Sequence, residues 1–518
     1  PGRIRTTIRA TMRTHSLAHP LLAAALLAAV LLSGCGAAAS VPAVAPADLP
    51  AQTLALTPTL PPAPTAAPPA LGVDPALLAA LRAQLNLPAG WQLAEAPQAA
   101  DVTLTLGADA PLAYWTYVLA APFDTFADQL SLAELQALWQ QGLPAAAVSN
   151  LLVDGETLNL FSAVWGAPST AVQSADSAAL LERAWNTPGV WALLPFEQLE
   201  PRWKVICLDG GTPLDDGFDP AAYPLSLPLT LQGDPELIQA LAAAPAPLLN
   251  GNFDPDQLTS VVVTGVTALV RGTASLMERE GMTYPAEDVG DILRSADILH
   301  VSNEVSFDKK CPAPYPWEGL KFCSREKYIE LLDSVGVDVV ELTGDHFADW
   351  GVDAMYNTLE MYAQRGWATY GGGINEEAGR QAAKFEINGN KIAFIGCNAK
   401  EKAYATASAS SPGAVHCDNA WLLPAIRELK DAGYLPIVTF QHLEYYSYDA
   451  KPALQADFRA AAEAGAVIVS GSQAHQPHAM EFDGAALLHY GLGDLFFDQV
   501  NFNPESAKAF IDRHLFYG

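Results

Sequence analysis

The sequence predicts a two-domain α/β protein, and three observations support that fold class. The chain has 518 residues, which is enough for two or three domains that each bury their own core. Short apolar runs of strand length alternate with helical patterns through residues 73–245 and again through 258–518. An alternation of this kind predicts a largely parallel sheet covered by helices, with ligand-binding side chains in the loops where the strands end.

The overall charge bears on the partners of the protein. Asp and Glu total 57 against 28 Lys and Arg, which gives a formal net charge of −29. No basic stripe and no interleaving of basic with aromatic residues is present, so the sequence predicts no nucleic-acid partner.

Residues 1–35 are typical of an export signal. Arginines precede the apolar stretch Leu17–Leu32, which is too short and wrongly flanked for a transmembrane helix. The residues Leu32-Ser33-Gly34-Cys35 resemble the bacterial lipobox, which implies that Cys35 is lipidated and becomes the mature N-terminus. We therefore expect an exported protein that is lipid-anchored to the outer face of the bacterial cell membrane. A plain secretory signal with an incidental cysteine is the alternative.

The ends of the chain and the segment after the signal carry further expectations. Met12 is the expected start of translation, and the strand-like end at residues 515–518 indicates a frame that continues and a C-terminus that is truncated. Residues 36–72 consist largely of Ala, Pro and Thr with almost no charge. A segment of that composition cannot bury enough apolar surface to fold, so we predict a disordered tether between membrane and first domain.

The first domain is expected over residues 73–245. A helical pattern at Leu77–Leu85 precedes strand patterns at Val102–Leu106 and 115–123, and Ser131 with Glu134 forms the capping-box signature of a further helix. The order of these elements loosely resembles a periplasmic solute-binding module of the phosphate-binding kind. Because no Gly-rich or Ser/Thr/Arg phosphate nest is present, we assign this domain no site residues, and a module that has kept its fold without its ligand remains the alternative.

The second domain is expected over residues 258–518, after a boundary rich in Ala, Pro and turn residues at Ala242–Asp256. Its strands are predicted at Val261–Thr264, Ile298–Val301, Val337–Leu342, Lys391–Gly396, Leu435–Phe440 and Ala466–Ser470, followed by a hairpin around Asp483-Gly484. Its helices are predicted near Asp288–Ser295, after a capping Ser324, and at Val352–Gln364. The apolar face predicted for the last helix comprises Val352, Met355, Tyr356, Leu359 and Tyr362.

The cysteines fit disulfide bonds, which persist in an oxidising location. Cys311 and Cys323 bracket one loop and Cys397 and Cys417 bracket another, so we pair them in that order. Structural zinc is the rival use, but the close C-x-x-C spacing that it normally needs is missing. Cys207 lies in an apolar run and is expected to be a buried thiol.

Polar side chains with metal-binding chemistry follow several predicted strands. The motif T-G-D-H-F-A-D-W-G begins at Thr343 after one strand, and G-S-Q-A-H-Q-P-H begins at Gly471 after another. The candidates at strand ends are Glu304, Asp345, His346, His442, Glu444, His475 and His478. Carboxylate and imidazole together suit Zn, Mn or Fe, and such a metal would act as a Lewis acid in phosphoester or peptide-type hydrolysis.

Several of these candidates also have a structural interpretation. Asp345 and His346 could cap the helix that follows, His442 could belong to an ordinary polar cluster with Glu444, and His478 could be a rim residue. Four such clusters at one sheet edge favour the metal site over these separate explanations.

Several of these motifs, in this order, resemble those of the capsule synthesis proteins of the CapA type, which are associated with poly-γ-glutamate and have a calcineurin-like metallophosphatase fold. The resemblance covers Ser260 to Gln499. The motif A-D-I-L-H-V-S-N-E matches the family's acid with Glu304, and T-G-D-H-F-A-D-W-G is similar to A-N-N-H…D-x-G. Most specific is Y-G-L-G-D-L-F-F-D-Q, which is close to Y-S-L-G-N-F-x-F-D-Q. The resemblance implies a divalent metal (Mn, Zn or Fe) with ligands among Glu304, Asp345, His346, His442, His475 and His478, and with His346 or His475 assisting hydrolysis.

The departures from the family pattern fall on the expected ligands. The family's opening strand ends in G-D, whereas here V-V-V-T-G is followed by Val266. Asp345 stands where the family has Asn, and either Gln441 or His442 takes the place of a family His. The resemblance therefore implies at most one good metal position, formed by Glu304, Asp345, His346 and His475, with slow or absent hydrolysis.

Three functions are compatible with these observations. The first is a cell-envelope lipoprotein that acts in synthesis or export of an anionic capsular polymer such as poly-γ-glutamate, with the membrane, the polymer and other envelope biosynthesis proteins as partners. The net charge of −29 opposes a polyanion, although screening over about 8 Å at physiological salt limits the repulsion to near contacts. The second is a metal-dependent phosphoesterase, and the third is a non-catalytic binding protein with a degenerate metal site.

Overall fold

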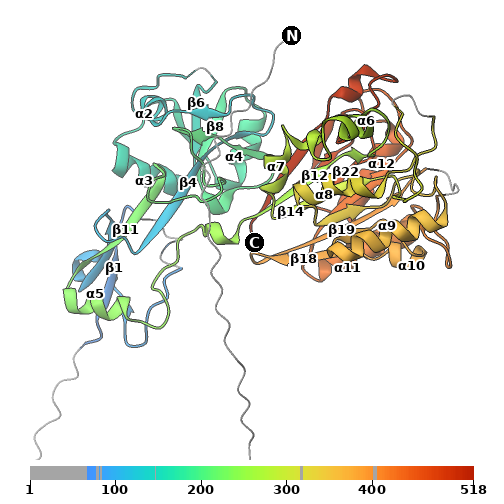
Figure 1. Cartoon of the computed structure of the whole chain (residues 1–518). Helices are drawn as coiled ribbons and strands as arrows, with labels where there is room; N and C mark the ends of the chain where they lie inside the picture. The colour runs from blue at the N-terminus through green and yellow to red at the C-terminus, as the bar shows by residue number, and fades with distance from the viewer. Residues whose placement is uncertain (1–66, 78–80, 82–83, 146, 316–318, 401–404) are drawn as a thin grey trace, which may run out of the picture. The chain divides into compact units, whose positions relative to one another are not determined.

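The computed structural model describes residues 67–518, apart from 78–80, 82–83, 146, 316–318 and 401–404. The signal segment with Cys35, most of the predicted tether and most of the helical pattern Leu77–Leu85 therefore lie outside the described residues. Within the described part of the chain, no helix is both long enough and apolar enough to cross a membrane. No described sheet combines strands from before residue 250 with strands from after it (Figure 1).

The first group of strands forms a mixed nine-stranded sheet. In spatial order its strands are β2 (Gln92–Leu93), β1 (Ala70–Val73), β3 (Val102–Leu106), β11 (Ser226–Gly233), β4 (Ala113–Pro122), β8 (Val190–Pro195), β6 (Asn150–Val153) and β7 (Val172–Ser174), with β9 (Trp203–Val205) also paired to β4. A separate pair is formed by β5 (Gln129–Leu130) and β10 (Cys207–Leu208). The predicted strand at Val102–Leu106 is confirmed with those bounds.

Four helices of this region follow local signals in the sequence. They are α2 (Leu132–Gln141), α3 (Gly155–Trp165), α4 (Ser177–Trp185) and α5 (Pro235–Ala242). The predicted capping box is confirmed: the Ser131 hydroxyl accepts from the Glu134 N–H at 3.2 Å, and the Glu134 carboxylate accepts from the Ser131 N–H at 2.9 Å. Both α2 and α3 bury aromatic side chains, Trp139 and Phe161, in the core of this region.

The second region contains two six-stranded sheets. The first, which we call sheet I, has the order β16 (Ala368–Tyr370), β15 (Val339–Glu341), β14 (Ile298–Asn303), β12 (Thr259–Thr264), β25 (Ile511–Phe516), with β13 (Val266–Thr267) also paired to β14. The second, sheet II, has the order β18 (Ala383–Ile387), β19 (Asn390–Asn398), β21 (Leu435–Gln441), β22 (Ile468–Ser470), β24 (Ala486–His489), β23 (Met480–Asp483). Short strands β17 (Gly372–Gly373) and β20 (Gly413–Ala414) pair separately.

Parallel pairing dominates both sheets, as the alternation of strands and helices predicts. In sheet I only β25 runs antiparallel to its neighbour, and in sheet II only the edge strands β18 and β23 do. The predicted hairpin is confirmed, since Asp483 pairs with Ala486 across a turn that contains Gly484.

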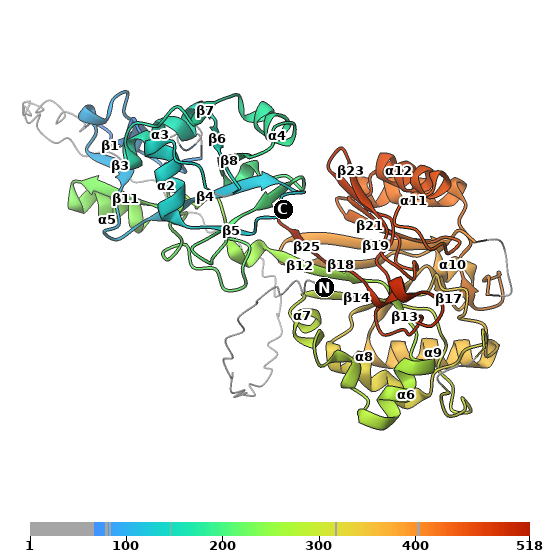
Figure 2. The same cartoon turned by 90° about the horizontal axis from the view of Figure 1, so that it is seen from above.

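The two sheets pack face to face, and helices cover their outer faces (Figure 2). Apolar side chains of both sheets, such as Val263 and Ile298 from sheet I and Phe394 and Ile437 from sheet II, share one buried cluster. On the outer face of sheet I lie α6 (Arg271–Glu280), α7 (Gly290–Arg294), α8 (Ile329–Val335) and α9 (Val352–Arg365), and on that of sheet II lie α11 (Asn419–Asp431) and α12 (Pro452–Ala464). A short helix, α10 (Glu376–Gly379), lies in the chain between the short strand β17 of residues 372–373 and strand β18 of sheet II. This layered sheet with flanking helices is the metallophosphatase-like α/β fold.

The inner face of α9 differs from the predicted one. Met355 and Tyr362 are buried as expected, but Val352 and Tyr356 are 47% and 44% exposed. Thr358 occupies the inner face instead, where its hydroxyl accepts the Phe307 N–H at 2.7 Å and donates to the Ala354 carbonyl. Helical spacing alone did not reveal that a buried backbone group of a neighbouring segment needs a polar partner there.

Ser324 does not cap a helix, so that prediction is wrong. Helix α8 begins at Ile329 after a 3₁₀ turn, Glu326–Tyr328, and has no side-chain cap. The Ser324 hydroxyl donates instead to the buried Leu269 carbonyl at 3.1 Å. A buried carbonyl needs a hydrogen-bond donor, and the Ser324 hydroxyl supplies it instead of capping a helix. The local sequence does not indicate this contact.

A buried polar network joins the two sheets. Glu341, on β15, accepts hydrogen bonds from Thr343 and Ser472 and lies 3.3 Å from His300 Nε2. His300 in turn contacts the Tyr370 hydroxyl at 2.9 Å, and that hydroxyl lies 3.0 Å from Thr439 Oγ1 on β21 of sheet II. Glu341 and His300 are fully buried, so the network fixes the register of one sheet on the other at the cost of desolvating a carboxylate.

Two disulfides close loops of the second region. Cys311 is bonded to Cys323 and Cys397 to Cys417, across 12 and 20 residues. Cys207 is free and half-buried rather than fully buried, and burial raises the pKa of its thiol.

Removing either bridge is expected to lower stability by about 3 kcal/mol, because each restricts the unfolded chain across a loop of ten to twenty residues. Peptide mapping of the unreduced protein should recover the peptide pairs Cys311–Cys323 and Cys397–Cys417. A thiol reagent applied after unfolding without reductant should label Cys207. Recovery of a peptide that pairs Cys207 with another cysteine would contradict this assignment.

Candidate functional site

The candidate site lies where parallel strands of both sheets end. Glu304 follows β14, and Asp345 and His346 follow β15, all in sheet I. From sheet II come Lys400 after β19, Glu444 after β21 and His475 after β22. The face-to-face packing brings these carboxyl-terminal loops together, as the argument from strand ends predicts.

Lys400 lies at the centre of the ion pairs of this site. Its Nζ is 2.8 Å from Asp345 Oδ2 and also donates to Glu444 Oε1. The Lys400 side chain is only 11% exposed. Burial alone would lower the pKa of Lys400, but the carboxylates of Glu444 and Asp345 raise it. The ammonium therefore bridges a carboxylate after sheet I and a carboxylate after sheet II.

A chain of amide hydrogen bonds holds Lys400 and Asp345 in place. The Lys400 N–H donates to Asn398 Oδ1 at 2.8 Å. The Asn398 amide donates to the Thr343 carbonyl at 2.7 Å and to Gln441 Oε1 at 2.5 Å. The Gln441 amide completes the chain by donating to Asp345 Oδ1 at 2.7 Å. Both oxygens of Asp345 are thus engaged by side chains of the protein.

Two histidines each pair with a buried carboxylate. His346 Nδ1 lies 2.7 Å from Asp349 Oδ2, and His475 Nδ1 lies 2.9 Å from Asp494 Oδ1. Burial alone would lower the pKa of each histidine, but the paired carboxylate and the charges of neighbouring acids raise it to about 9. Burial raises the pKa of Asp494 to about 6, against the opposing effect of the charge and hydrogen bond of His475.

Glu304 is buried beside these groups, and neither of its carboxylate oxygens has a hydrogen-bond partner among the residues that the structure describes. Burial raises its pKa to about 7, against the opposing effect of His346 and His475. Gly344 allows the close approach of the two strand ends, because a Cβ at that position would lie 2.4 Å from Glu304 Cβ. An unpartnered buried carboxyl marks the place where the site could receive a further group.

Two of the sequence candidates lie apart from this group. His442 Nε2 is 3.0 Å from Asp457 Oδ2 on α12, without hydrogen-bond geometry, and the imidazole packs against Phe440. His478 stacks on Tyr445 with ring centroids 4.3 Å apart, and its nitrogens face two backbone carbonyls. Gln441, the alternative to His442 in the family motif, is the residue that contacts Asp345. The helix-capping interpretation of Asp345 and His346 is wrong, since α9 has no side-chain cap.

The residues present do not fit the metal that the resemblance implies. Lys400 already lies between Asp345 and Glu444, where a cation would have to bind. Val266, at the position expected to supply an acid, is fully buried in an apolar cluster with Phe322 and Phe497. Among the residues that the structure describes, no group of three or more His, Cys, Asp or Glu side chains is arranged to hold a metal ion.

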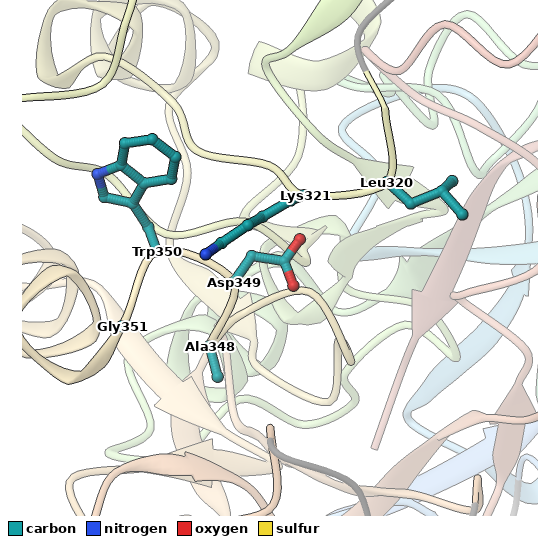
Figure 3. Close-up of a pocket in the computed structure, with 6 residues that line it drawn as sticks. All are labelled: Leu320, Lys321, Ala348, Asp349, Trp350 and Gly351. Carbon is teal, nitrogen blue, oxygen red and sulfur yellow. The ribbon is translucent and has the colours of Figure 1, made fainter.

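A cavity of about 470 Å³ is lined in part by Asp349, the partner of His346. It is lined by Leu320, Lys321, Ala348, Asp349, Trp350 and Gly351 (Figure 3). The Lys321 side chain extends toward the space between Trp350 and Asp349, and its Nζ is 5.9 Å from the centroid of the Trp350 ring. Asp349 connects this cavity to the site, because the same carboxylate oxygen contacts His346 and accepts the Phe322 N–H.

Comparison with known proteins identifies the second region. Its layered sheets with flanking helices define the class, a metallophosphatase-like α/β fold. Residues 260–499 match the sequence model of the family described as "Bacterial capsule synthesis protein PGA_cap". Over these residues, which are slightly less than half of the chain, the sequence is similar to the capsule synthesis proteins of the CapA type.

Two curated relatives have similar sequences. The chain is 24% identical over 269 residues to "Capsule biosynthesis protein CapA" of Bacillus anthracis, which covers 50% of this chain and 64% of the relative. It is 24% identical over 264 residues to "PGA biosynthesis protein CapA" of Bacillus subtilis (strain 168), which covers 50% of this chain and 68% of that protein. The chain thus spans about two thirds of the length of these relatives.

Two solved structures are similar to this chain at low TM-scores. A phosphate transport receptor from Vibrio cholerae has a TM-score of 0.27 at 11% identity and covers 34% of this chain and 92% of its own. The protein TT1561 of Thermus thermophilus also has a TM-score of 0.27, at 12% identity, and covers 46% of this chain and 91% of its own. The resemblance of residues 73–245 to a solute-binding module therefore stays a prediction.

Proposed function

We propose that the chain is a cell-envelope lipoprotein that acts in the synthesis or export of an anionic capsular polymer such as poly-γ-glutamate. The observation that carries this proposal is the family domain at residues 260–499, together with its two CapA relatives. The site at the strand ends supports a role in which the domain handles a charged chain, because cationic and anionic side chains of the protein meet there. Lipid attachment at Cys35 would hold the domain at the outer face of the membrane.

The polymer is proposed to enter through the cavity lined in part by Asp349. Lys321 supplies a cation for a carboxylate group, and Trp350 supplies an apolar wall for the aliphatic part of the chain. The overall negative charge repels the polymer at a distance, but charges separated by more than about 8 Å are largely screened at physiological salt. Local cations therefore decide the affinity.

Lys321→Glu is expected to weaken binding of poly-γ-glutamate about tenfold, which corresponds to roughly 1.4 kcal/mol for reversing one charge near the polymer. A titration of fluorescently labelled polymer into the full chain measures the dissociation constant. Lys310→Glu makes the same charge change at an exposed residue that does not line the cavity, and it should leave the constant nearly unchanged. Equal weakening by both variants would indicate a non-specific charge effect and remove the cavity from the proposal.

Phosphoester hydrolysis is the second candidate function, and the two histidine–carboxylate pairs favour it. A histidine oriented by a carboxylate is suited to move a proton in hydrolysis. His475, paired with Asp494, and His346, paired with Asp349, have this arrangement. Turnover of a generic phosphodiester by the purified chain, abolished in His475→Asn, would favour this function. Since the ligand set does not fit a metal, we expect hydrolysis to be slow or absent.

A further inference from the structure

We propose that the ammonium group of Lys400 replaces the divalent cation of this site, so that the chain holds its strand-end carboxylates together without metal. This inference concerns the site itself and stands whether or not the polymer is poly-γ-glutamate. It assigns Lys400 a positioning role that the family motifs do not contain.

The contacts of Lys400 are those expected of a resident cation. Its Nζ contacts Asp345 Oδ2 at 2.8 Å and Glu444 Oε1, and these acids follow strands of different sheets. Metals in protein sites bridge carboxylates of separate loops in the same way. With 11% of the side chain exposed, Lys400 is fixed inside the site rather than extended over its surface.

The surroundings leave little freedom for Lys400 to move aside. Its backbone N–H is tied to Asn398, and Asn398 is tied to Gln441, which holds the second oxygen of Asp345. Releasing the ammonium would leave two partly buried carboxylates without a counterion, which is unfavourable in a region of low dielectric. An added divalent cation would in addition be repelled by the ammonium at short range.

A second, independent feature agrees with the replacement of the divalent cation by Lys400. The position where the family resemblance expects an acid is Val266, which packs in an apolar cluster and cannot bind a cation. The same segment forms a bridge to Asp494, whose Oδ1 lies 2.9 Å from His475 Nδ1. The site has thus lost an anionic ligand and gained a cationic side chain, and both changes lower its affinity for metal.

The effect of substituting Lys400 follows from the carboxylates that would remain in the site. Asp345 and Glu444 would lose their counterion, and the charges of both act on Glu304, whose buried oxygens have no hydrogen-bond partner in the described part of the chain. The Asp345 and Glu444 oxygens that now contact the ammonium would then be open to another cation, and carboxylate oxygens are ligands suited to Mn²⁺. Lys400→Gln should therefore create a metal site that the natural chain lacks.

The experiment measures Mn²⁺ binding by the full chain, purified in detergent and first stripped with a chelator. Isothermal titration and metal analysis after gel filtration are applied to the natural chain and to Lys400→Gln, Lys400→Arg and Lys391→Gln. We expect Lys400→Gln to bind Mn²⁺ at least about tenfold more tightly than the natural chain. Lys400→Arg, which keeps the cation, and Lys391→Gln, which removes an exposed ammonium 3.5 Å from Glu386, should behave like the natural chain.

Thermal unfolding provides a readout that does not depend on activity. Mn²⁺ should raise the unfolding temperature of Lys400→Gln and leave that of the natural chain unchanged, because a ligand stabilises only a protein that binds it in the folded state. The proposal is overturned if the natural chain retains about one or more Mn²⁺ after gel filtration. That result is decisive even if Lys400→Gln fails to fold. A folded Lys400→Gln protein that gains no affinity for Mn²⁺ would overturn it equally.

Discussion

Changing Cys35 to Ser is expected to move the protein from the membrane fraction to the soluble fraction. The prediction rests on the lipobox resemblance of Leu32-Ser33-Gly34-Cys35 after an apolar stretch that is too short to span a bilayer. Each buried methylene of a lipid anchor contributes about 0.8 kcal/mol, so loss of the acyl chains changes membrane partition by several orders of magnitude. Fractionation of cells that express each form, followed by immunoblotting, measures the effect.

Cys207→Ser is the matched control for this prediction. It makes the same chemical change at the half-buried free cysteine and should leave the protein in the membrane fraction. Mass spectrometry of the N-terminal peptide gives a direct second readout, since the natural protein should carry lipid on Cys35. An unlipidated Cys35 at the mature N-terminus, or a Cys35→Ser protein that stays at the membrane with its signal removed, would contradict the anchor.

Glu341→Ala is expected to cause the largest loss of stability of any single substitution proposed for the second domain, about 3–5 kcal/mol. The substitution removes the acceptor of Thr343 and Ser472 and leaves these buried donors, together with His300, without their partner. Typical domains have a total unfolding free energy of only about 5–15 kcal/mol, so the variant should approach the limit of folding. Urea unfolding followed by tryptophan fluorescence measures the loss.

Glu341→Gln removes the negative charge at this position but keeps the shape of the side chain, so it measures the contribution of the charge to stability. Burial alone would raise the pKa of Glu341, but the hydrogen bonds from His300, Ser472 and Thr343 hold it below its ordinary value. A carboxyl whose pKa is lower in the folded state contributes stability above its unfolded pKa, and that contribution disappears as the pH falls through the folded pKa. The difference in stability between the natural protein and the Glu341→Gln variant should therefore shrink below about pH 4.

The control for both substitutions is Glu386→Ala. Glu386 lies on β18, and its side chain is 60% exposed beside Lys391. A surface pair of this kind contributes about 0–1 kcal/mol, so the control should unfold nearly as the natural protein does. A Glu341→Ala protein as stable as the control would show that the buried network does not hold the two sheets together.

The strands of the second domain were predictable because their apolar runs are long and their periodicity is unambiguous. β12, β14, β19 and β21 all contain the runs from which they were predicted. Failures occurred where a polar residue serves a distant backbone group. Thr358 and Ser324 each hydrogen-bond a segment remote in sequence, and no local pattern carries that information.

The sequence predicted the place of the candidate site better than the residues that form it. Strand ends and motif order pointed to Glu304, Asp345, His346, Glu444 and His475, and the structure brings these residues to one edge. Lys400 was missed because a lone lysine after an apolar strand has no distinguishing pattern, and only the packing of sheet II on sheet I places it between Asp345 and Glu444. Asp494 was present in the most specific motif, where an acid replaces the family's Asn, and that exchange was the signal for its pairing with His475.

The most direct test of the central claim is the amount of anionic capsular polymer on cells that lack this protein. Extraction of the cell surface, followed by acid hydrolysis and quantification of glutamate, measures poly-γ-glutamate itself. The account predicts that the polymer falls strongly in the absence of the protein and returns when the natural chain is restored. Equal amounts of surface polymer with and without the protein would contradict a role in its synthesis or export.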